Sequence, residues 1–141
     1  MDNIIVGYDG SEGAVKALDA ASDLAGRLGA ALHVIFCYEP PALLAGGAAG
    51  AQRDEIEELG RTRLAEAMTR LEGTTLTAEG ELVDANAVDG LIAAADQYDA
   101  IFIVVGHHGE GPLRGALLGA TANKLLHQAE RPVLVVPAVD G

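Results

Sequence analysis

The feature that most constrains the fold is a repeated alternation between short apolar runs and longer segments with helical periodicity. The apolar runs predict five strands, at 3–8, 31–38, 75–83, 100–105 and 133–136. The segments between them predict four helices, at 12–28, 52–71, 86–98 and 119–129. Strands that alternate with helices predict a parallel sheet with helices on both faces, because each helix returns the chain to the same end of the sheet.

The predicted fold class is therefore α/β, and residues 1–141 contain no internal repeat or linker that would divide them into two domains. The run at 100–105 is the most apolar of the five, which favours a place at the centre of the sheet. The run at 75–83 alternates between apolar and polar residues, which is typical of an edge strand.

Two loops have an unusual backbone composition, and both follow a predicted strand. The first loop reads GYDGS at Gly7–Ser11, and the second runs from Gly106 to Gly119 after the fourth strand. The second loop holds five glycines in fourteen positions: Gly106, Gly109, Gly111, Gly115 and Gly119. Glycine suits a positive φ or a close approach to a ligand, and bare N–H groups before a helix bind anions. Ligands of such sheets bind where the winding reverses. If the first and fourth strands are neighbours, the two loops meet at that point and predict a shared anion site. A plain surface loop is the alternative.

Several nucleotide-binding motifs are absent. The first strand ends in GYDGS, which does not match the G-x-G-x-x-G of dinucleotide-binding folds. No lysine follows a glycine in the spacing that a P-loop requires. The topology is compatible with a flavodoxin-type site, but the chain has no tryptophan and few aromatic residues to stack on a flavin.

The composition limits the classes of partner that we expect for the protein and indicates its location in the cell. The formal net charge of −12 disfavours nucleic acid and anionic membranes, and it requires any phosphate to be held by local donors. No apolar run approaches the roughly 20 residues of a membrane span, and the N-terminus lacks the features of a signal peptide. The single cysteine, Cys37, lies in an apolar stretch and is most simply a small buried residue. We expect a cytoplasmic protein.

The glycine loop also has a definite spacing: G-x-x-G at 106–109, nine residues, then Gly119-Ala120. Together with IIVGYDGS, LHVIFCYEP, DAIFIVVGHHG and ERPVLVVP, this spacing makes the chain resemble the universal stress protein family over its whole length. The resemblance implies a homodimer with sheet order 3-2-1-4-5, a Rossmann-like fold of the adenine nucleotide alpha hydrolase type, and a role in the stress response. Some family members bind ATP, and others bind no nucleotide.

The resemblance also assigns roles to residues. Asp9 would approach the adenosine, Val34 would meet the adenine with its backbone, Gly106 would pass beside the ribose, and Gly109 and Gly119 would bring N–H groups to the phosphates. The full candidate set for ATP, with or without Mg²⁺, is Gly7, Asp9, Val34, Gly106, His107, His108, Gly109, Arg114, Gly119, Ala120 and Thr121.

The chain departs from the nucleotide-binding members at Ala120, where they have a serine or threonine whose hydroxyl reaches a phosphate. A hydrogen bond to a charged group is worth about 1.5–3 kcal/mol, so its loss would weaken binding roughly 10- to 100-fold. Thr121 is the next residue but lies about 100° further around the helix axis.

Other candidate residues have simpler interpretations. Asp9 also suits a turn in which its side-chain carboxylate accepts a hydrogen bond from a backbone N–H further along the same turn. Arg114 is the only cation in the glycine loop, and it is either a phosphate partner or an ordinary surface residue. His107 and His108 are adjacent and lack the i, i+4 spacing of a paired metal site, which favours a position facing solvent or at the phosphate edge.

No nucleophile–base pair or carboxylate dyad stands out in the sequence. The sequence therefore favours a nucleotide-binding regulatory module over an enzyme, with a slow ATPase and a nucleotide-free interaction module as alternatives. We expect a homodimer through the apolar run at 133–136, because a bare strand edge pairs readily with its own copy. A regulatory protein partner, not identified by the sequence, is compatible with such a module.

Overall fold

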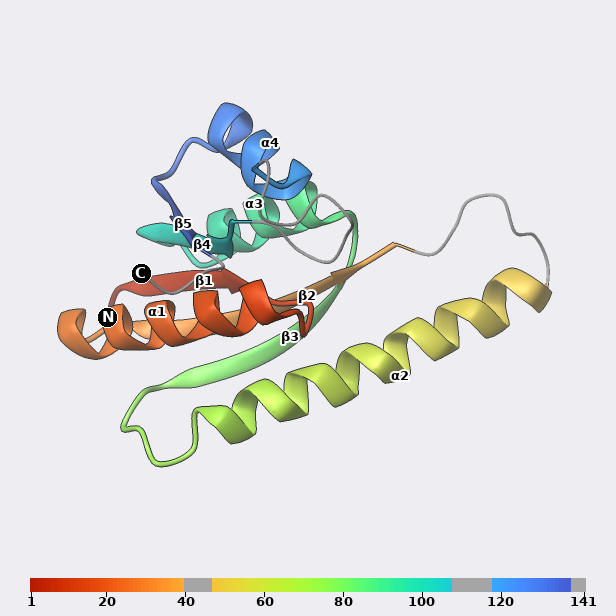
Figure 1. The fold of residues 1–141 in the computed structure, drawn as a ribbon, viewed down its shortest axis with the longest axis horizontal. Coiled ribbons are helices and arrows are strands. Elements are labelled where there is room, and N and C mark those ends of the chain that lie inside the picture. Colours follow the sequence, from red (N-terminus) through yellow and green to blue (C-terminus); the bar gives the residue numbers. More distant parts are fainter. Residues whose placement is uncertain (40–46, 108–117, 138–141) are drawn as a thin grey trace.

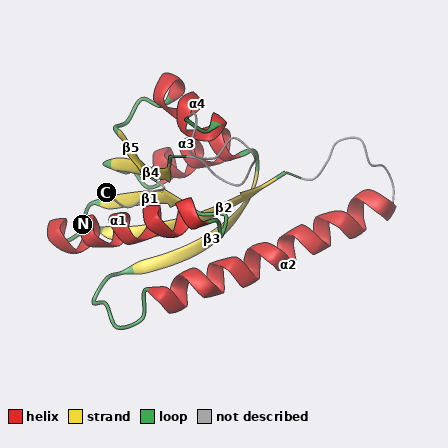
Figure 2. Ribbon diagram, viewed as in Figure 1, coloured by secondary structure: helices red, strands yellow, loops and turns green. Residues whose placement is uncertain are grey.

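The computed structural model describes residues 1–39, 47–107 and 118–137. Within these ranges lie the strands β1 (Asn3–Gly7), β2 (Ala31–Tyr38), β3 (Ala78–Asp84), β4 (Phe102–Gly106) and β5 (Val133–Val136). The helices are α1 (Glu12–Leu28), α2 (Gly47–Arg70), α3 (Ala87–Gln97) and α4 (Ala120–Gln128). Strands and helices alternate along the chain, as the sequence predicts (Figure 2).

All neighbouring strands are parallel, and their order is β3-β2-β1-β4-β5. This confirms the predicted order 3-2-1-4-5. The prediction of the central strand was wrong, because β1 occupies the centre and β4 lies between β1 and β5. Apolar content alone does not separate the two strands, since Ile4, Ile5 and Val6 in β1 and the middle residues of β4 are all buried.

Helices cover both faces of the sheet (Figure 1). On one face, alternate strand residues such as Ile4, Val6 and Val34 pack with residues of α1 and α2. On the opposite face, Ile5 and Ile35 pack with residues of α3 and α4. This division follows from the two-residue period of a strand, which sends successive side chains to opposite faces.

Helix starts follow the capping residues in the sequence. Ser11 caps α1, and its Oγ accepts a hydrogen bond from the Ala14 N–H at 3.1 Å. Asn86 caps α3 through the Asp89 N–H at 2.9 Å. Gly29 ends α1 in the left-handed conformation, with a φ of 65°. These signals placed both helix starts correctly.

Two elements begin more than two residues from their predicted starts. Helix α2 begins at Gly47 rather than at 52, and strand β3 covers Ala78–Asp84 rather than 75–83. The amino-terminal part of α2 projects beyond the sheet (Figure 1), where no apolar stripe announces a helix in the sequence. Among the described helices, none combines the length and the apolar character that crossing a membrane requires.

Candidate functional site

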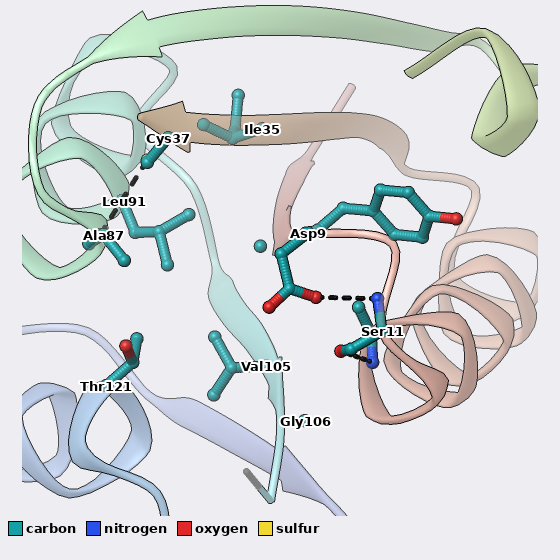
Figure 3. Close-up of a pocket in the computed structure, with 12 residues that line it drawn as sticks. Asp9, Ser11, Ile35, Cys37, Ala87, Leu91, Val105, Gly106 and Thr121 are labelled. Carbon is teal, nitrogen blue, oxygen red and sulfur yellow. Dashed lines mark hydrogen bonds between the residues drawn. The ribbon is translucent and has the colours of Figure 1, made fainter. Parts of the chain in front are cut away.

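A cleft of about 100 Å³ opens at the carboxyl ends of the central strands. It is lined by Gly7, Tyr8, Asp9, Ser11, Ala14, Ile35, Cys37, Ala87, Leu91, Val105, Gly106 and Thr121. Figure 3 shows residues from β2, α3 and α4 around one side and Asp9 and Ser11 on the other. The cleft lies between β1 and β4, where the winding of the sheet reverses. The first residues of both loops that the sequence singles out, Gly7 and Gly106, line it.

The turn after β1 presents the carboxylate of Asp9 at the cleft. One oxygen, Oδ1, accepts a hydrogen bond from the Ser11 N–H at 2.9 Å, and the residue is exposed to solvent. Gly10 occupies the middle of this turn with a φ of 83°, a conformation that L side chains rarely adopt. Asp9 is thus a turn residue, as its simpler interpretation predicts, and it also lines the cleft.

Gly106 permits a close backbone contact between the end of β4 and the start of α1. A Cβ at this position would lie 2.8 Å from the carbonyl oxygen of Gly13 and 2.9 Å from its carbonyl carbon. Because these are backbone atoms, they cannot move aside as a side chain would. Gly7, also in the cleft, would instead meet the end of the Leu91 side chain. The first glycine of the loop is therefore required by packing.

The start of α4 offers backbone donors near the same cleft. Gly119 is its N-cap and contributes no side-chain bond, while the Gly119 N–H donates to the His107 carbonyl at 2.8 Å. The first N–H groups of a helix have no partner within it, and they carry the positive end of the helix dipole. The His107 N–H in turn donates to the Val136 carbonyl at 2.8 Å, which ties this corner to β5.

Thr121, and not Ala120, lines the cleft. Ala120 is exposed and lines only a neighbouring groove, which Lys124 and also Thr121 line. One position along a helix turns a side chain by about 100°, which accounts for the different surroundings of the two residues. The hydroxyl that the sequence lacks at position 120 is available one residue later.

The remaining candidates are distributed as follows. Val34 is fully buried between β1 and β3, paired with Val6 and Gly80, and it does not line the cleft. Strand β2 presents Ile35 and Cys37 there instead, because they face the α3 side of the sheet. His108, Gly109 and Arg114 lie outside the described residues.

Cys37 is the lining residue that sequence reasoning placed only in the core. Its Sγ lies 4.0 Å from the Ala87 carbonyl oxygen (Figure 3). Burial, and then the negative charge of Glu81, raises the pKa of the thiol to about 12. The thiol therefore stays neutral near pH 7 and contributes an apolar wall rather than a nucleophile. The signal for its position was its spacing of two residues from Ile35 on one strand face.

The described cleft contains one carboxylate, Asp9, and no histidine. No group of three His, Cys, Asp or Glu residues that could hold a metal ion occurs within 1–39, 47–107 and 118–137. What the cleft offers is an apolar wall from β2, α3 and β4, one acidic acceptor, the hydroxyl-bearing residues Tyr8, Ser11 and Thr121, and the donor end of a helix. This arrangement suits a ligand with an apolar ring system and an anionic end.

Fold and site together define a doubly wound α/β protein with a cleft at the switch point of a five-stranded parallel sheet. The model of the universal stress protein family matches residues 1–137, so the chain belongs to that family. It is 32% identical to the universal stress protein Rv1636 of Mycobacterium tuberculosis over 140 residues, which covers 94% of both chains.

Two solved structures of similar proteins contain adenine nucleotides. A universal stress protein in complex with cAMP superimposes with a TM-score of 0.70 and 26% identity, over 98% of both chains. The universal stress protein from Archaeoglobus fulgidus in complex with dAMP gives a TM-score of 0.66 and 21% identity, over 96% of this chain and 97% of the other. These likenesses agree with the five-stranded fold described above.

Proposed function

We propose that the cleft binds an adenine nucleotide, with ATP as the expected ligand, and that the protein is a nucleotide-dependent regulatory module of the stress response. The observation that carries this proposal is the convergence of an exposed carboxylate, a hydroxyl and a helix N-terminus on one cleft with an apolar wall. The complexes of two similar proteins with cAMP and dAMP support the choice of an adenine nucleotide as the ligand.

The chemistry of each residue suggests its role. The Asp9 carboxylate can accept hydrogen bonds from ribose hydroxyls, and Ile35, Leu91 and Val105 offer apolar surface to the base. The Thr121 hydroxyl and the first N–H groups of α4 would face the phosphate end. Because the net charge is −12, these local donors must outweigh an unfavourable overall potential.

Binding rather than turnover is the function that the described residues favour. Hydrolysis requires a group that activates water, and Asp9 is the one carboxylate among the described lining residues. One of its oxygens is already engaged by the Ser11 N–H. A slow ATPase is therefore the weaker candidate, and Mg²⁺, if present, would come with the phosphates of the nucleotide.

Calorimetry with ATP, with and without Mg²⁺, and with AMP and cAMP tests the proposal. We expect saturable binding in the millimolar range or tighter. Thr121→Val should weaken it about 10-fold or more, the value of a hydrogen bond to a charged group. Thr75→Val, an exposed substitution outside the cleft, is the matched control. If no nucleotide gives heat or a thermal shift, the nucleotide-free interaction module replaces this proposal.

A further inference from the structure

One cation outside the cleft lies directly against the turn that carries Asp9. It is Arg63, on the middle of α2. A Cβ placed on Gly10 would lie 2.6 Å from Arg63 Cδ and 2.8 Å from its Nε. The side chain of Arg63 therefore packs on the bare backbone of Gly10, in the space that any other residue at position 10 would fill.

Contacts along α2 hold Arg63 in this place. Its Nη1 donates to both carboxylate oxygens of Glu66, at 3.2 and 3.1 Å. Leu64 is buried in the core against the sheet. Further along α2, Arg70 donates two hydrogen bonds to Asp19 of α1, from Nε to Oδ1 and from Nη2 to Oδ2, each at 2.7 Å. The helix is thus fixed to the sheet next to Arg63 and to α1 further along.

The turn itself has few internal restraints. Gly10 has no side chain and can adopt many backbone conformations. The hydrogen bond from the Ser11 N–H to Asp9 and the Ser11 cap of α1 are the local bonds that define it. The side chain packed on Gly10 excludes alternative conformations of the turn. Because the turn is then already ordered, less conformational entropy is lost when the ligand binds.

We propose that Arg63 is a positioning residue, which holds the turn Asp9–Ser11 in the conformation that the ligand requires. The proposal rests on the proposed function of the cleft. It assigns the effect to the stem of Arg63 from Cγ to Nε, because these atoms lie nearest to Gly10 and Nη1 is engaged by Glu66. Arg63 thereby links the occupancy of the cleft to helix α2.

Three variants separate this role from its alternatives. Arg63→Ala removes the stem, whereas Arg63→Met keeps an unbranched apolar chain and removes the charge. Arg61→Ala is the matched control, because Arg61 is exposed and pairs only with Glu57 and Glu58 of its own helix among its described ion pairs. If the turn of the Arg63→Ala variant occupies the binding conformation about one tenth of the time, the Kd of this variant for ATP is about 10-fold higher than that of the unmodified chain. Arg63→Met and Arg61→Ala should bind like the unmodified chain.

Hydrogen exchange of the Ser11 amide supplies a readout that needs no ligand. Without nucleotide, this amide should exchange faster in Arg63→Ala than in the unmodified chain and in Arg63→Met. Equal losses of affinity in Arg63→Ala and Arg63→Met would overturn the proposal in favour of a direct guanidinium contact, and so would an unchanged Ser11 exchange rate. If the unmodified chain binds no nucleotide, the proposed function fails, and the exchange rates alone decide whether Arg63 orders the turn.

Discussion

Gly106 illustrates how a single residue joins the core to the candidate site. Its Cα faces the backbone of Gly13 at the start of α1, and Gly106 itself lines the cleft at the end of β4. The sequence singles out Gly106 as part of an anion-binding loop, whereas the structure gives it a packing role as well. A glycine that a motif associates with a ligand can therefore be required even when the ligand is absent.

Replacing Gly106 with alanine should destabilise the fold. The added methyl group would meet the Gly13 carbonyl at 2.8 Å, and overpacking of this kind costs about 1–3 kcal/mol. Urea denaturation measures the change. Gly50→Ala is the control, because nothing lies within 4 Å of its added Cβ and alanine is the better helix former by about 1 kcal/mol. Equal stability of Gly106→Ala and the unmodified chain would show that the contact can relax.

His33 connects stability to pH on the opposite side of the fold from α1. The ring is buried, stacks on Tyr98 at 3.9 Å between centroids, and places Nε2 2.9 Å from Asn3 Oδ1. Burial lowers the pKa of His33, and the nearby Glu79 and Glu81 oppose this shift. The unfolded chain therefore binds a proton more readily at this residue than the folded chain does.

The free energy of unfolding should accordingly decrease as pH falls through about 6.5, the ordinary pKa of histidine, toward the lower pKa of the folded state. Urea denaturation between pH 8 and pH 5 measures this loss, at a protein concentration where unfolding is a two-state transition. In His33→Phe, which retains an aromatic ring against Tyr98, the loss should be smaller. His127→Gln, at an exposed position of α4, should lose stability as the unmodified chain does. An equal loss in His33→Phe would assign the pH dependence to other groups.

At the scale of elements, helix α2 is the least uniform part of the structure. Its carboxyl-terminal half packs on the sheet through Leu64, Ala67 and Leu71, which lies just beyond its end. Its amino-terminal half is attached by polar contacts instead. Arg53 contacts Asp84 at the end of β3, and the Tyr38 hydroxyl at the end of β2 donates to Glu57 at 2.8 Å.

Arg53→Ala should loosen the start of α2 without unfolding the protein. Ion pairs between exposed side chains contribute about 0–1 kcal/mol, so the global free energy of unfolding should change little. Hydrogen exchange at amides 51–56 should become faster, while exchange in the second half of α2 stays the same. Arg27→Ala, which removes an exposed pair within α1, controls for loss of charge. Uniform protection along α2 in Arg53→Ala would show that the helix start does not depend on this contact.

The elements that the sequence predicted to the residue are those with unambiguous signals at both ends. Helix α1 has Ser11 before it and Gly29 after it, and the short strand β5 is bracketed by Pro132 and Pro137. The start of α2 has no such signal, because its alanine and glycine residues fit a loop equally well. Near that start, Arg53 contacts Asp84, which is 31 positions away in the sequence. Contacts at such separation cannot be deduced from local pattern.

The site shows the same division. Asp9, Gly106 and Thr121 were found from motifs, and all three line the cleft. Cys37, Leu91 and Ala87 were not assigned to it, because which strand and helix faces border a cleft depends on how α3 packs on β2. Arg63 carries no motif at all. Its contact with Gly10 arises only from the position of α2 against α1 and the sheet.

At the scale of the whole molecule, β5 leaves one edge of the sheet unpaired among the described strands. It pairs only with β4, and Leu134 is 37% exposed. A strand edge with apolar side chains can pair with its own copy around a two-fold axis, and this closes the assembly. We therefore propose that the protein forms a homodimer through Val133–Val136, in line with the expectation from sequence.

Light scattering at micromolar concentration tests this interface. The unmodified chain should have about twice the monomer mass of 14.4 kDa, and Leu134→Lys should shift it toward the monomer, because a charge would face the partner strand. Leu28→Lys, at an exposed position of α1, is the control. A monomeric mass for the unmodified chain would contradict the proposal, and a dimer that tolerates Leu134→Lys would place the interface on another surface.

The central claim is that the cleft between β1 and β4 holds an adenine nucleotide. The most direct measurement is an NMR titration with ATP that follows backbone amide shifts. The account predicts saturable changes concentrated at Asp9, Ser11, Gly106 and Thr121, while amides of α1 near its end at Leu28 remain unchanged. Asp9→Asn should weaken the response at all of these cleft amides. Saturable shifts located elsewhere, or no shifts at millimolar ATP, would contradict the account.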